Sequence, residues 1–597
     1  MADDVTAQAQ GHNGSKVSRR SLLAAAGAVT GGAVLARAPR VAKAAGQSFD
    51  AEADVIVVGG GGAAFAAAIG AAQAGTKVLV LEKAPAIGGT TARSGGAYWI
   101  PNNHLLRAKG VEDPKDPAVA LMARLAFPTV YDPEAPALGL DRFSHGLLSA
   151  YYDLAPTVLT RIERMGAIRS QIAALRPGQN ATDGIDWTHP EYHAELPENK
   201  APYGRTLNPI GAEGGGGGSL MTGLAGYARR QGVRVMTGQH VVQLATNAKG
   251  EVVGVQAITA DGERLYRARR AVVFGSGGFT QDRSKVMNYL RGPIFGGCAV
   301  PTNTGDFIDM ASQLGARLGN MRNGFFVQHV LEQALANSSV VDDLWIPPGD
   351  AMIMVNRYGV RVASEKTPYN EHTQSHFVWD TTRAEYPNLV QFMVYDDAVA
   401  NDPYQAYGAP IPVPGKRAPH VISGATIPQL AQKIEERLTR LRGRFAINGA
   451  IGPDVRLDDR FAATLQQTID RFDGFAREGR DPDFGRGSTP IQVSWGGARR
   501  RGNAKNPSMH PFSSSGPYHC ILIGGGTLDT NGGPVVDASG RVLHVSGRPI
   551  PGLYGAGNCV ASLAGQAYWS AGGTLGPAIT GGFTAGENAL SEPVKEV

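Results

Sequence analysis

The stretch Ala53-Asp54-Val55-Ile56-Val57-Val58, followed by Gly59-Gly60-Gly61-Gly62-Ala63-Ala64, decides the fold of this chain. An apolar strand runs into a glycine-rich turn, and an alanine-rich helix follows to about Ala74. Lys77 to Leu81 then reads as a second strand, which completes a βαβ unit. Gly59 suits the tight turn, and Gly61 lets a pyrophosphate approach the amides at the start of the helix. The pattern predicts a dinucleotide-binding domain.

Two features near this unit indicate which dinucleotide binds. Glu82 follows the second strand, where a carboxylate can accept hydrogen bonds from ribose hydroxyls. The loop from Gly88 to Gly96 is rich in small and hydroxyl residues, which can cradle phosphates and approach a flat ring. Nicotinamide-binding domains do not usually carry such a loop, so we predict non-covalent FAD. The expected contacts are Gly59, Gly61, Gly62, Ala63, Ala64, Glu82, Lys83, Gly89, Thr90, Thr91, Ser94, Gly95, Gly96, Val242, Asp306, Gly557, Asn558, Gly573, Thr574 and Leu575.

The C-terminal region brings a second glycine-rich stretch. Residues 552–558 read as a strand end that turns into a flavin-contacting loop, and residues 565–577 follow it. Tyr568 stands four residues before Gly572, whose lack of a side chain lets its backbone N–H approach a ligand. A phenol and an N–H that converge on one point can bind a carbonyl oxygen and stabilise its enolate. We therefore expect a redox reaction beside a carbonyl group.

The remaining segments suggest an α/β protein with a cofactor domain that is split in sequence. We predict a Rossmann-like FAD-binding domain at residues 50–325, with a mainly helical insertion at about 104–200, and its second part at 511–597. The five-glycine run 214–218 is expected to bend against the cofactor. Residues 326–510 lack dinucleotide features and hold two charge-rich amphipathic helices, so we interpret them as an inserted α+β substrate-binding cap domain.

Residues 1–44 resemble an export leader rather than part of the fold. Arg19 and Arg20 form a twin-arginine pattern, a weakly apolar segment follows, and Ala42-Lys43-Ala44 suits cleavage. We expect the export machinery to carry the folded protein to the periplasm; the alternative is a disordered tail on a cytoplasmic protein. The apolar segment is too short for a stable membrane span.

Charge and cysteine content argue against a nucleic-acid-binding protein and against a metal site. The chain has 57 basic and 52 acidic residues, a net charge of +5. Six basic and two acidic residues lie in the leader, which leaves +1 for the rest and gives no support for nucleic-acid binding. Cys298, Cys520 and Cys559 show no metal-binding spacing, so we predict no metal site.

These motifs together resemble the superfamily of FAD-dependent fumarate reductases and 3-ketosteroid dehydrogenases, and most closely the 3-ketosteroid Δ1-dehydrogenases. The matching segments are residues 59–64, 88–96, 304–306, 356–369, 516–518, 526–528 and 552–577. The resemblance implies that Tyr568 and Gly572 bind the substrate ketone and that Tyr369 is the base, with Tyr192 supporting it. It implies a hydrophobic, steroid-like ketone as substrate and desaturation of the adjacent C–C bond, and leaves the electron acceptor open.

Two alternatives remain at this point. The fumarate reductase branch clamps a dicarboxylate with arginines, and an ene-reductase of that kind would act on an unsaturated carboxylate or enone. Tyr568 to Gly573 replaces the Arg-Leu-Gly-Gly run of that branch, and residues 365–369 contain no arginine. The chain also departs from the steroid enzymes, because Trp569-Ser570-Ala571-Gly572 replaces their Pro-Gly-Pro-Gly. The other alternative is an electron-carrier flavoprotein, which needs no enolising tyrosines. His329 is interpreted as structural.

Overall fold

The computed structural model describes residues 42–43, 48–72, 75–175, 179–211, 216–340, 343–344, 346–444, 455–496 and 505–597. The predicted leader lies outside these residues except for Ala42–Lys43, which forms strand β1. This strand pairs in parallel with Ala245 and Thr246 of β8 (His240–Thr246). Two residues of the predicted cleavage site therefore lie on a sheet in this structure.

The first sheet has nine strands and contains the predicted βαβ unit. Strands β2 (Ala51–Val58) and β3 (Val78–Leu81) are parallel, and helix α2 (Gly62–Ala71) connects them. β2 also pairs with β10 (Gly262–Phe274), which in turn pairs with β20 (Pro549–Gly555) in parallel. β7 (Arg234–Met236), β9 (Val252–Thr259) and β19 (Arg541–Leu543) complete the sheet with β1 and β8. Every residue of β2 from Ala53 onward is buried, as expected for a strand covered on both faces.

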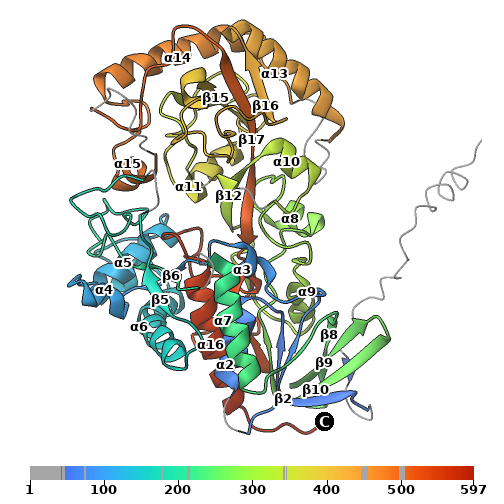
Figure 1. Cartoon of the computed structure of the whole chain (residues 1–597). Helices are drawn as coiled ribbons and strands as arrows, with labels where there is room; N and C mark the ends of the chain where they lie inside the picture. The colour runs from blue at the N-terminus through green and yellow to red at the C-terminus, as the bar shows by residue number, and fades with distance from the viewer. Residues whose placement is uncertain are drawn as a thin grey trace, which may run out of the picture. The chain divides into compact units, whose positions relative to one another are not determined.

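One face of this sheet is covered by α2 with α7 (Gly216–Arg230) and α16 (Leu575–Ser591), which lie side by side in Figure 1. Small residues bring α2 and α16 very close. A Cβ at Gly70 would overlap the carbonyl oxygen of Phe583, and one at Gly586 would overlap that of Ala67. The alanine- and glycine-rich sequence of both helices thus packs the last helix of the chain against the first helix of the cofactor fold.

The second sheet has six antiparallel strands. They are β12 (Gly324–Val330), β13 (Asp343–Leu344), β14 (Met352–Val355), β15 (Val390–Asp396), β16 (Val421–Gly424) and β17 (Tyr518–Thr530). Helices α13 (Ile427–Leu441) and α14 (Phe461–Glu478) bury their apolar faces in the same core, and both match the predicted amphipathic segments. β17 continues this sheet beyond residue 510, and residues 40–597 form one compact unit.

Shorter helices complete the fold. They are α8 (Arg283–Tyr289), α9 (Asp306–Gln313), α10 (Leu331–Ala336), α11 (Tyr369–Gln374), α12 (Asp397–Ala400) and α15 (Pro490–Gly496). Strands β11 (Leu318–Gly319) and β18 (Gly533–Pro534) pair with each other.

The insertion at residues 104–200 is helical only in its first part. Helices α4 (His104–Ala108), α5 (Lys115–Ala126) and α6 (Arg142–Arg164) are followed by strand β5 (Ser170–Ile172) and by turns. β5 joins a small sheet with β4 (Tyr98–Trp99), which precedes these helices, and β6 (Thr206–Pro209), which follows the insertion. Pro190, Pro197 and Pro202 lie in the non-helical part, where each lacks the N–H that a helix interior needs. The short helix α3 (Gly89–Arg93) forms the predicted phosphate loop.

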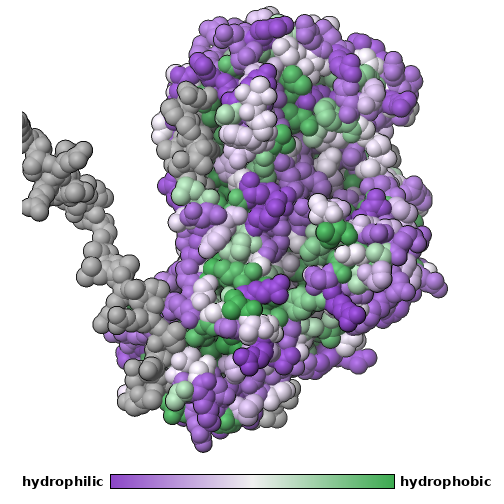
Figure 2. Space-filling view, turned by 180° about the vertical axis from the view of Figure 1, so that it is seen from behind, coloured by the Kyte–Doolittle hydropathy of each residue, from purple (hydrophilic) through white to green (hydrophobic). Residues whose placement is uncertain are grey.

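The surface gives no sign of a membrane-spanning segment in the part of the chain that is described. Within those residues, no helix combines the length and apolar character needed to cross a bilayer. Figure 2 shows one face as mainly hydrophilic, with apolar residues gathered in its middle and lower parts.

Candidate active site

A large cavity lies where the two sheets meet. Its empty volume is about 1780 Å³, part of which opens to solvent. Its walls come from the βαβ unit, from β8 and β17, from the C-terminal glycine-rich segment and from three tyrosines.

The dinucleotide end of the cavity is built by backbone groups of the fingerprint. Gly59 has φ of +115°, and a Cβ there would lie 2.5 Å from the carbonyl oxygen of Gly275. Gly61 is the N-cap of α2, so the first turn of the helix and the positive end of the helix dipole meet the cavity. Thr91 accepts a hydrogen bond from the Gly62 N–H at 3.0 Å, which fixes the phosphate loop against this turn.

Glu82 stands at the end of β3 and lines the cavity, as expected for an acid that binds ribose hydroxyls. Its Oε1 accepts a hydrogen bond from the Ala84 N–H at 2.6 Å. Burial raises the pKa of this carboxyl above its usual value. A Cβ at Gly60 would lie 2.7 Å from the Glu82 carboxylate, so a larger residue there would displace the acid.

A cluster of polar side chains surrounds Asp306 at the start of α9. The Lys83 ammonium lies 3.0 Å from its carboxylate, and His240 Nε2 lies 3.1 Å from the same oxygen. Burial alone would raise the pKa of Asp306, but the hydrogen bond from His240 and the Lys83 charge outweigh it and hold that pKa well below its usual value. The predicted contacts Lys83 and Asp306 are thus joined in one cluster, and His240 is a member that sequence analysis missed.

The C-terminal segment closes the other side of the dinucleotide end. Gly557 and Asn558 line the cavity, as do Thr574 and Leu575 at the N-terminus of the 17-residue helix α16. Asp529 of β17 connects the parts, because it accepts hydrogen bonds from the Gly278 N–H and the Asn303 amide, both at 2.8 Å. Sequence analysis did not select Asp529, since a single acid in an apolar strand carries no motif.

Most predicted cofactor contacts lie on the cavity wall, and three do not. The residues on the wall are Gly59, Gly61, Gly62, Ala63, Glu82, Lys83, Gly89, Thr90, Thr91, Ser94, Gly95, Gly96, Asp306, Gly557, Asn558, Thr574 and Leu575. Ala64 is fully buried behind the wall, in close contact with Gly275. Val241 lines the cavity and Val242 does not, and the register of β8 with β9 shifts between Val241 and Gln243. Gly573 turns its N–H to the carbonyl of Ser570 instead.

The described part of the five-glycine run, from Gly216 onward, meets the phosphate loop. Gly216 and Gly217 begin α7, and the Gly217 N–H donates to the carbonyl of Ser94 at 2.9 Å. A Cβ at Gly96 would lie 2.5 Å from the Gly217 nitrogen, so both segments require glycine at this contact. Gly216 and Gly217 therefore contact the phosphate loop, and the phosphate loop in turn lines the cavity.

Three tyrosines from distant segments form the other end of the cavity. Tyr192 lies in a turn after the helical insertion, Tyr369 begins α11, and Tyr568 lies in the C-terminal segment. The ring centroids of Tyr369 and Tyr568 are 5.1 Å apart, and those of Tyr192 and Tyr369 are 5.6 Å apart. The Tyr192 hydroxyl donates to the Tyr369 hydroxyl at 3.3 Å. All three predicted tyrosines are thus brought together.

Gly572 completes this end of the cavity. Its N–H donates a hydrogen bond to the Tyr568 hydroxyl at 3.3 Å, so the phenol and the backbone donor lie side by side. With φ of +89°, Gly572 packs against Tyr98, whose backbone nitrogen would lie 2.5 Å from an added Cβ. Trp569 turns away from the cavity and packs with Trp99 and Tyr151. Although Trp569-Ser570-Ala571-Gly572 stands where the steroid enzymes have Pro-Gly-Pro-Gly, Tyr568 and Gly572 still lie next to each other.

Burial changes the acidity of the tyrosines. It raises the pKa of the Tyr369 phenol well above 10. It also raises the pKa of Tyr568, although hydrogen bonds with Tyr369 and Thr574 partly offset the effect. Both phenols therefore hold their protons at neutral pH in the absence of ligand. His329 is fully buried on β12 and does not line the cavity.

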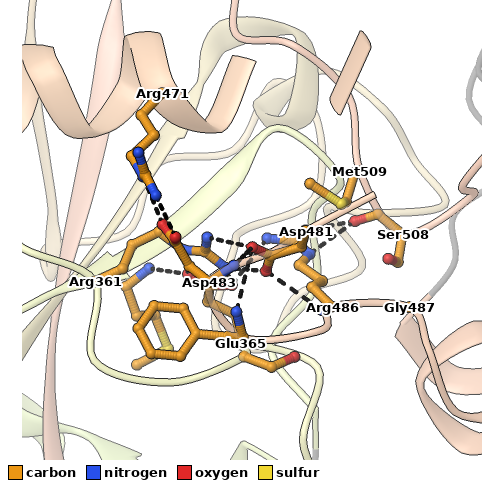
Figure 3. A network of polar contacts seen from close by, with 12 residues as sticks. Arg361, Glu365, Arg471, Asp481, Asp483, Arg486, Gly487, Ser508 and Met509 are labelled. Atoms are coloured by element: carbon orange, nitrogen blue, oxygen red, sulfur yellow. Dashed lines mark hydrogen bonds and ion pairs between the residues drawn. The ribbon is translucent and has the colours of Figure 1, made fainter. Parts of the chain in front are cut away.

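A buried ionic network holds the segment that precedes Tyr369 (Figure 3). Arg361 binds Glu365 through two hydrogen bonds of 2.7 and 2.8 Å and also pairs with Asp481. Arg486 contacts Glu365 at 3.2 Å and donates to the backbone carbonyls of Gly349, Asp350, Met352 and Ser508. We call Arg361, Glu365, Asp481 and Arg486 the cap ionic network.

The fold and cavity define an α/β flavoprotein with a dinucleotide site beside a tyrosine-lined substrate site. The chain belongs to the FAD binding domain family, which matches residues 54–575. It is 31% identical to the 4-oxocyclohexanecarboxylate 2-dehydrogenase of Sinomonas cyclohexanicum, over 90% of this chain and 93% of that protein. It is 29% identical to the 3-oxosteroid 1-dehydrogenase of Mycolicibacterium smegmatis, over 89% of this chain and 96% of that protein.

The fold is similar to a solved enzyme of the same kind. The crystal structure of 3-ketosteroid delta1-dehydrogenase from Sterolibacterium denitrificans, in complex with 1,4-androstadiene-3,17-dione, superposes with a TM-score of 0.73. The two chains are 25% identical, with coverage of 90% of this chain and 99% of that one. The predicted family, α/β fold and FAD cofactor are confirmed, and the protein is an FAD-dependent dehydrogenase acting on CH–CH groups.

Proposed function

We propose that the protein removes two hydrogens from adjacent carbons beside a ring ketone, and that Tyr568, Gly572, Tyr369 and Tyr192 carry the reaction. The convergence of the Tyr568 hydroxyl and the Gly572 N–H, with the Tyr369 ring 5.1 Å from Tyr568, is the observation that supports this most directly. A ketone oxygen placed between the phenol and the N–H would receive two hydrogen bonds.

These two donors matter because an α C–H bond of a ketone is a weak acid unless its enolate is stabilised. One preorganised donor to a developing oxyanion contributes about 2.7–4 kcal/mol. Gly572 supplies its donor from a backbone that Tyr98 holds rigidly, so no side-chain rearrangement is needed. Tyr568 supplies its donor in neutral form, since burial keeps its phenol protonated.

Tyr369 is assigned as the base that takes the α-proton. Its phenolate is costly in a buried site, and Tyr192 lowers that cost by donating its hydroxyl to the Tyr369 oxygen. This works only while Tyr192 keeps its own proton, because a second phenolate would repel the first. FAD, when bound, accepts the hydride from the β-carbon.

The wall of this end of the cavity favours an apolar cyclic ketone. Tyr192, Tyr369, Tyr568, Trp495 and Leu528 are among the residues that line the cavity. Among the described residues, Arg93 is the only arginine on the wall of the whole cavity, and it is engaged with Ser339. An arginine clamp for a dicarboxylate is therefore missing from the described wall, which disfavours fumarate. The named substrates of the two relatives, an oxosteroid and an oxocyclohexanecarboxylate, are both cyclic ketones.

The test is dye reduction by the purified flavoprotein with 3-ketosteroids, substituted cyclohexanones and fumarate. We expect dye reduction with at least one cyclic ketone and none with fumarate or succinate. Reduction of fumarate by the dithionite-reduced protein, with no ketone oxidised, would support the ene-reductase instead. Turnover of no substrate at all would favour the electron carrier. Heat denaturation should release free FAD, because the proposed binding is non-covalent.

A further inference from the structure

Trp495 carries a hydrogen-bond donor that the proposed reaction does not use. This residue of α15 lines the cavity at its tyrosine end. Its indole Nε1 is buried and has no hydrogen-bond partner among the described residues. An indole N–H can only donate, and a buried donor without an acceptor costs free energy. A buried donor that remains unsatisfied beside a ligand cavity points to an acceptor on the ligand.

The indole is held firmly in place. It makes edge-to-face contacts with Tyr192, at a centroid distance of 5.6 Å, and with His189, at 5.1 Å. The backbone of α15 is fixed by Asn180, whose N–H donates to the carbonyl of Ser494 at 2.9 Å and whose side-chain amide donates to that of Val493 at 3.0 Å. The N–H therefore belongs to a preorganised wall.

The distance between Trp495 and the ketone-binding groups limits where the acceptor lies on the ligand. The Tyr192 ring is 5.6 Å from Trp495 and 6.1 Å from Tyr568, so the centroids of Trp495 and Tyr568 are at most about 12 Å apart. One rigid ring system can span such a distance with an oxygen at each end. Tyr568 and Gly572 would hold one oxygen, and Trp495 the other.

The acceptor is expected to be uncharged. Lys83 and Arg93 are the lysine and arginine on the described cavity wall, and they are engaged with Asp306 and Ser339. On the described wall, a carboxylate beside Trp495 would meet an N–H but no free lysine or arginine, and burial of an unpaired charge is costly. A ketone oxygen needs one donor and carries no such cost.

We propose that the indole N–H of Trp495 binds a second, uncharged oxygen of the substrate, so that the preferred substrates are cyclic diketones rather than monoketones. This inference rests on the proposed function, because it extends the same substrate site. Trp495 acts here as a specificity residue and takes no part in proton or hydride transfer.

The test compares matched ketones with the FAD-loaded protein. One pair is androst-4-ene-3,17-dione and androst-4-en-3-one, and the other is cyclohexane-1,4-dione and cyclohexanone; two skeletons are used because the depth of the site is not assumed. Binding is measured by the change in the flavin absorbance spectrum, and turnover by dye reduction. For at least one pair we expect the wild type to bind the diketone about tenfold more tightly, the usual scale of one hydrogen bond.

Trp495→Phe should remove this preference and leave the affinity for the monoketone within about threefold. Trp379→Phe, at an exposed cap tryptophan, is the control and should keep the preference. Equal affinity of the wild type for both members of each pair would overturn the inference, even if Trp495→Phe did not fold. An equal loss for diketone and monoketone in the variant would also overturn it. Diketone binding without turnover of any ketone would instead contradict the proposed function.

Discussion

The cap ionic network and the tyrosine end of the cavity are both buried and polar, but their hydrogen bonding differs. In the network, the Glu365 carboxylate accepts from Arg361, from Arg486 and from the Met354 N–H. In the cavity, the tyrosine hydroxyls contact one another, and the Trp495 N–H has no partner in the described part of the chain. A satisfied network fixes a structure, whereas an unsatisfied group is available to a ligand.

The two regions are joined by a short segment of chain. Glu365 precedes Tyr369 by four residues, and Pro368 separates the extended part of this segment from α11. The network therefore holds the segment that presents Tyr369 to the cavity. The comparison separates two kinds of polar residue that look alike in a sequence: those that keep the site in shape and those that act in it.

Replacement of the base should have the largest effect. Tyr369→Phe removes the group that takes the α-proton, and a positioned base contributes about 10²–10⁴-fold. We expect kcat to fall by at least 10³-fold while FAD content and thermal stability stay near those of the wild type. Tyr395→Phe, at another buried tyrosine of the cap that does not line the cavity, should retain activity. Near-normal turnover by Tyr369→Phe would remove Tyr369 from the mechanism.

Replacement in the network should instead reduce stability. Glu365→Gln leaves Arg361 and Arg486 with an uncompensated buried charge, which typically costs about 3–5 kcal/mol. Urea and thermal unfolding should show the loss. Asp153→Asn, which breaks an exposed pair with Lys115, should cost no more than about 1 kcal/mol. If both variants unfolded alike, the network would not stabilise the cap.

The loss of stability in Glu365→Gln should depend on pH in a definite direction. Burial would raise the pKa of Glu365, but Arg361 and Arg486 outweigh it and lower that pKa to about 2. The stabilisation is therefore present above the ordinary carboxyl pKa and disappears as the pH falls through about 2. Wild type and Glu365→Gln should converge in stability between about pH 5 and pH 2. A gap that stayed constant over this range would contradict the assignment.

The next effect on activity should come from loss of the phenol that donates to the ketone oxygen. Tyr568→Phe removes one of two oxyanion donors and should lower kcat by about 10²–10³-fold. The Gly572 N–H remains, so a residual rate above background is expected. Flavin release and unfolding temperature serve as controls, because the phenyl ring preserves the packing against Phe325. A change in KM alone would mean that Tyr568 binds substrate and transition state equally well.

The smallest expected effect is a change in the pH dependence of kcat/KM when Tyr192 is replaced. Burial holds the pKa of Tyr369 well above 10, so the phenolate fraction rises about tenfold per pH unit below that value. We therefore expect kcat/KM to increase from pH 7 to pH 9. Tyr192→Phe removes a donor to the phenolate and should displace the rise to higher pH. Superimposable profiles of the two proteins would show that Tyr192 has no role in activating the base.

The sequence predicted those parts that depend on local patterns. The fingerprint at residues 59–64, the amphipathic helices α13 and α14, and the convergence of Tyr568 with Gly572 follow from spacing and from family motifs. Val242 stays a prediction; its neighbour Val241 lies on the cavity wall, next to a register shift in β8 that has no sequence signal. Asp529 and His240 were missed since their roles arise from neighbours more than 60 residues away. Trp495 was missed for the same reason, because its neighbour Tyr192 belongs to another segment.

The contact between α16 and α2 has a consequence for how this protein is made. The first helix of the cofactor fold finds its closest partner in the last helix of the chain, across more than 500 residues. Contacts so distant in sequence form late and slow the search for the native state. The cavity wall is therefore complete only once α16 has packed on α2, because Leu575 and Ala578 of α16 belong to that wall. We expect a truncation that removes α16 to weaken flavin retention.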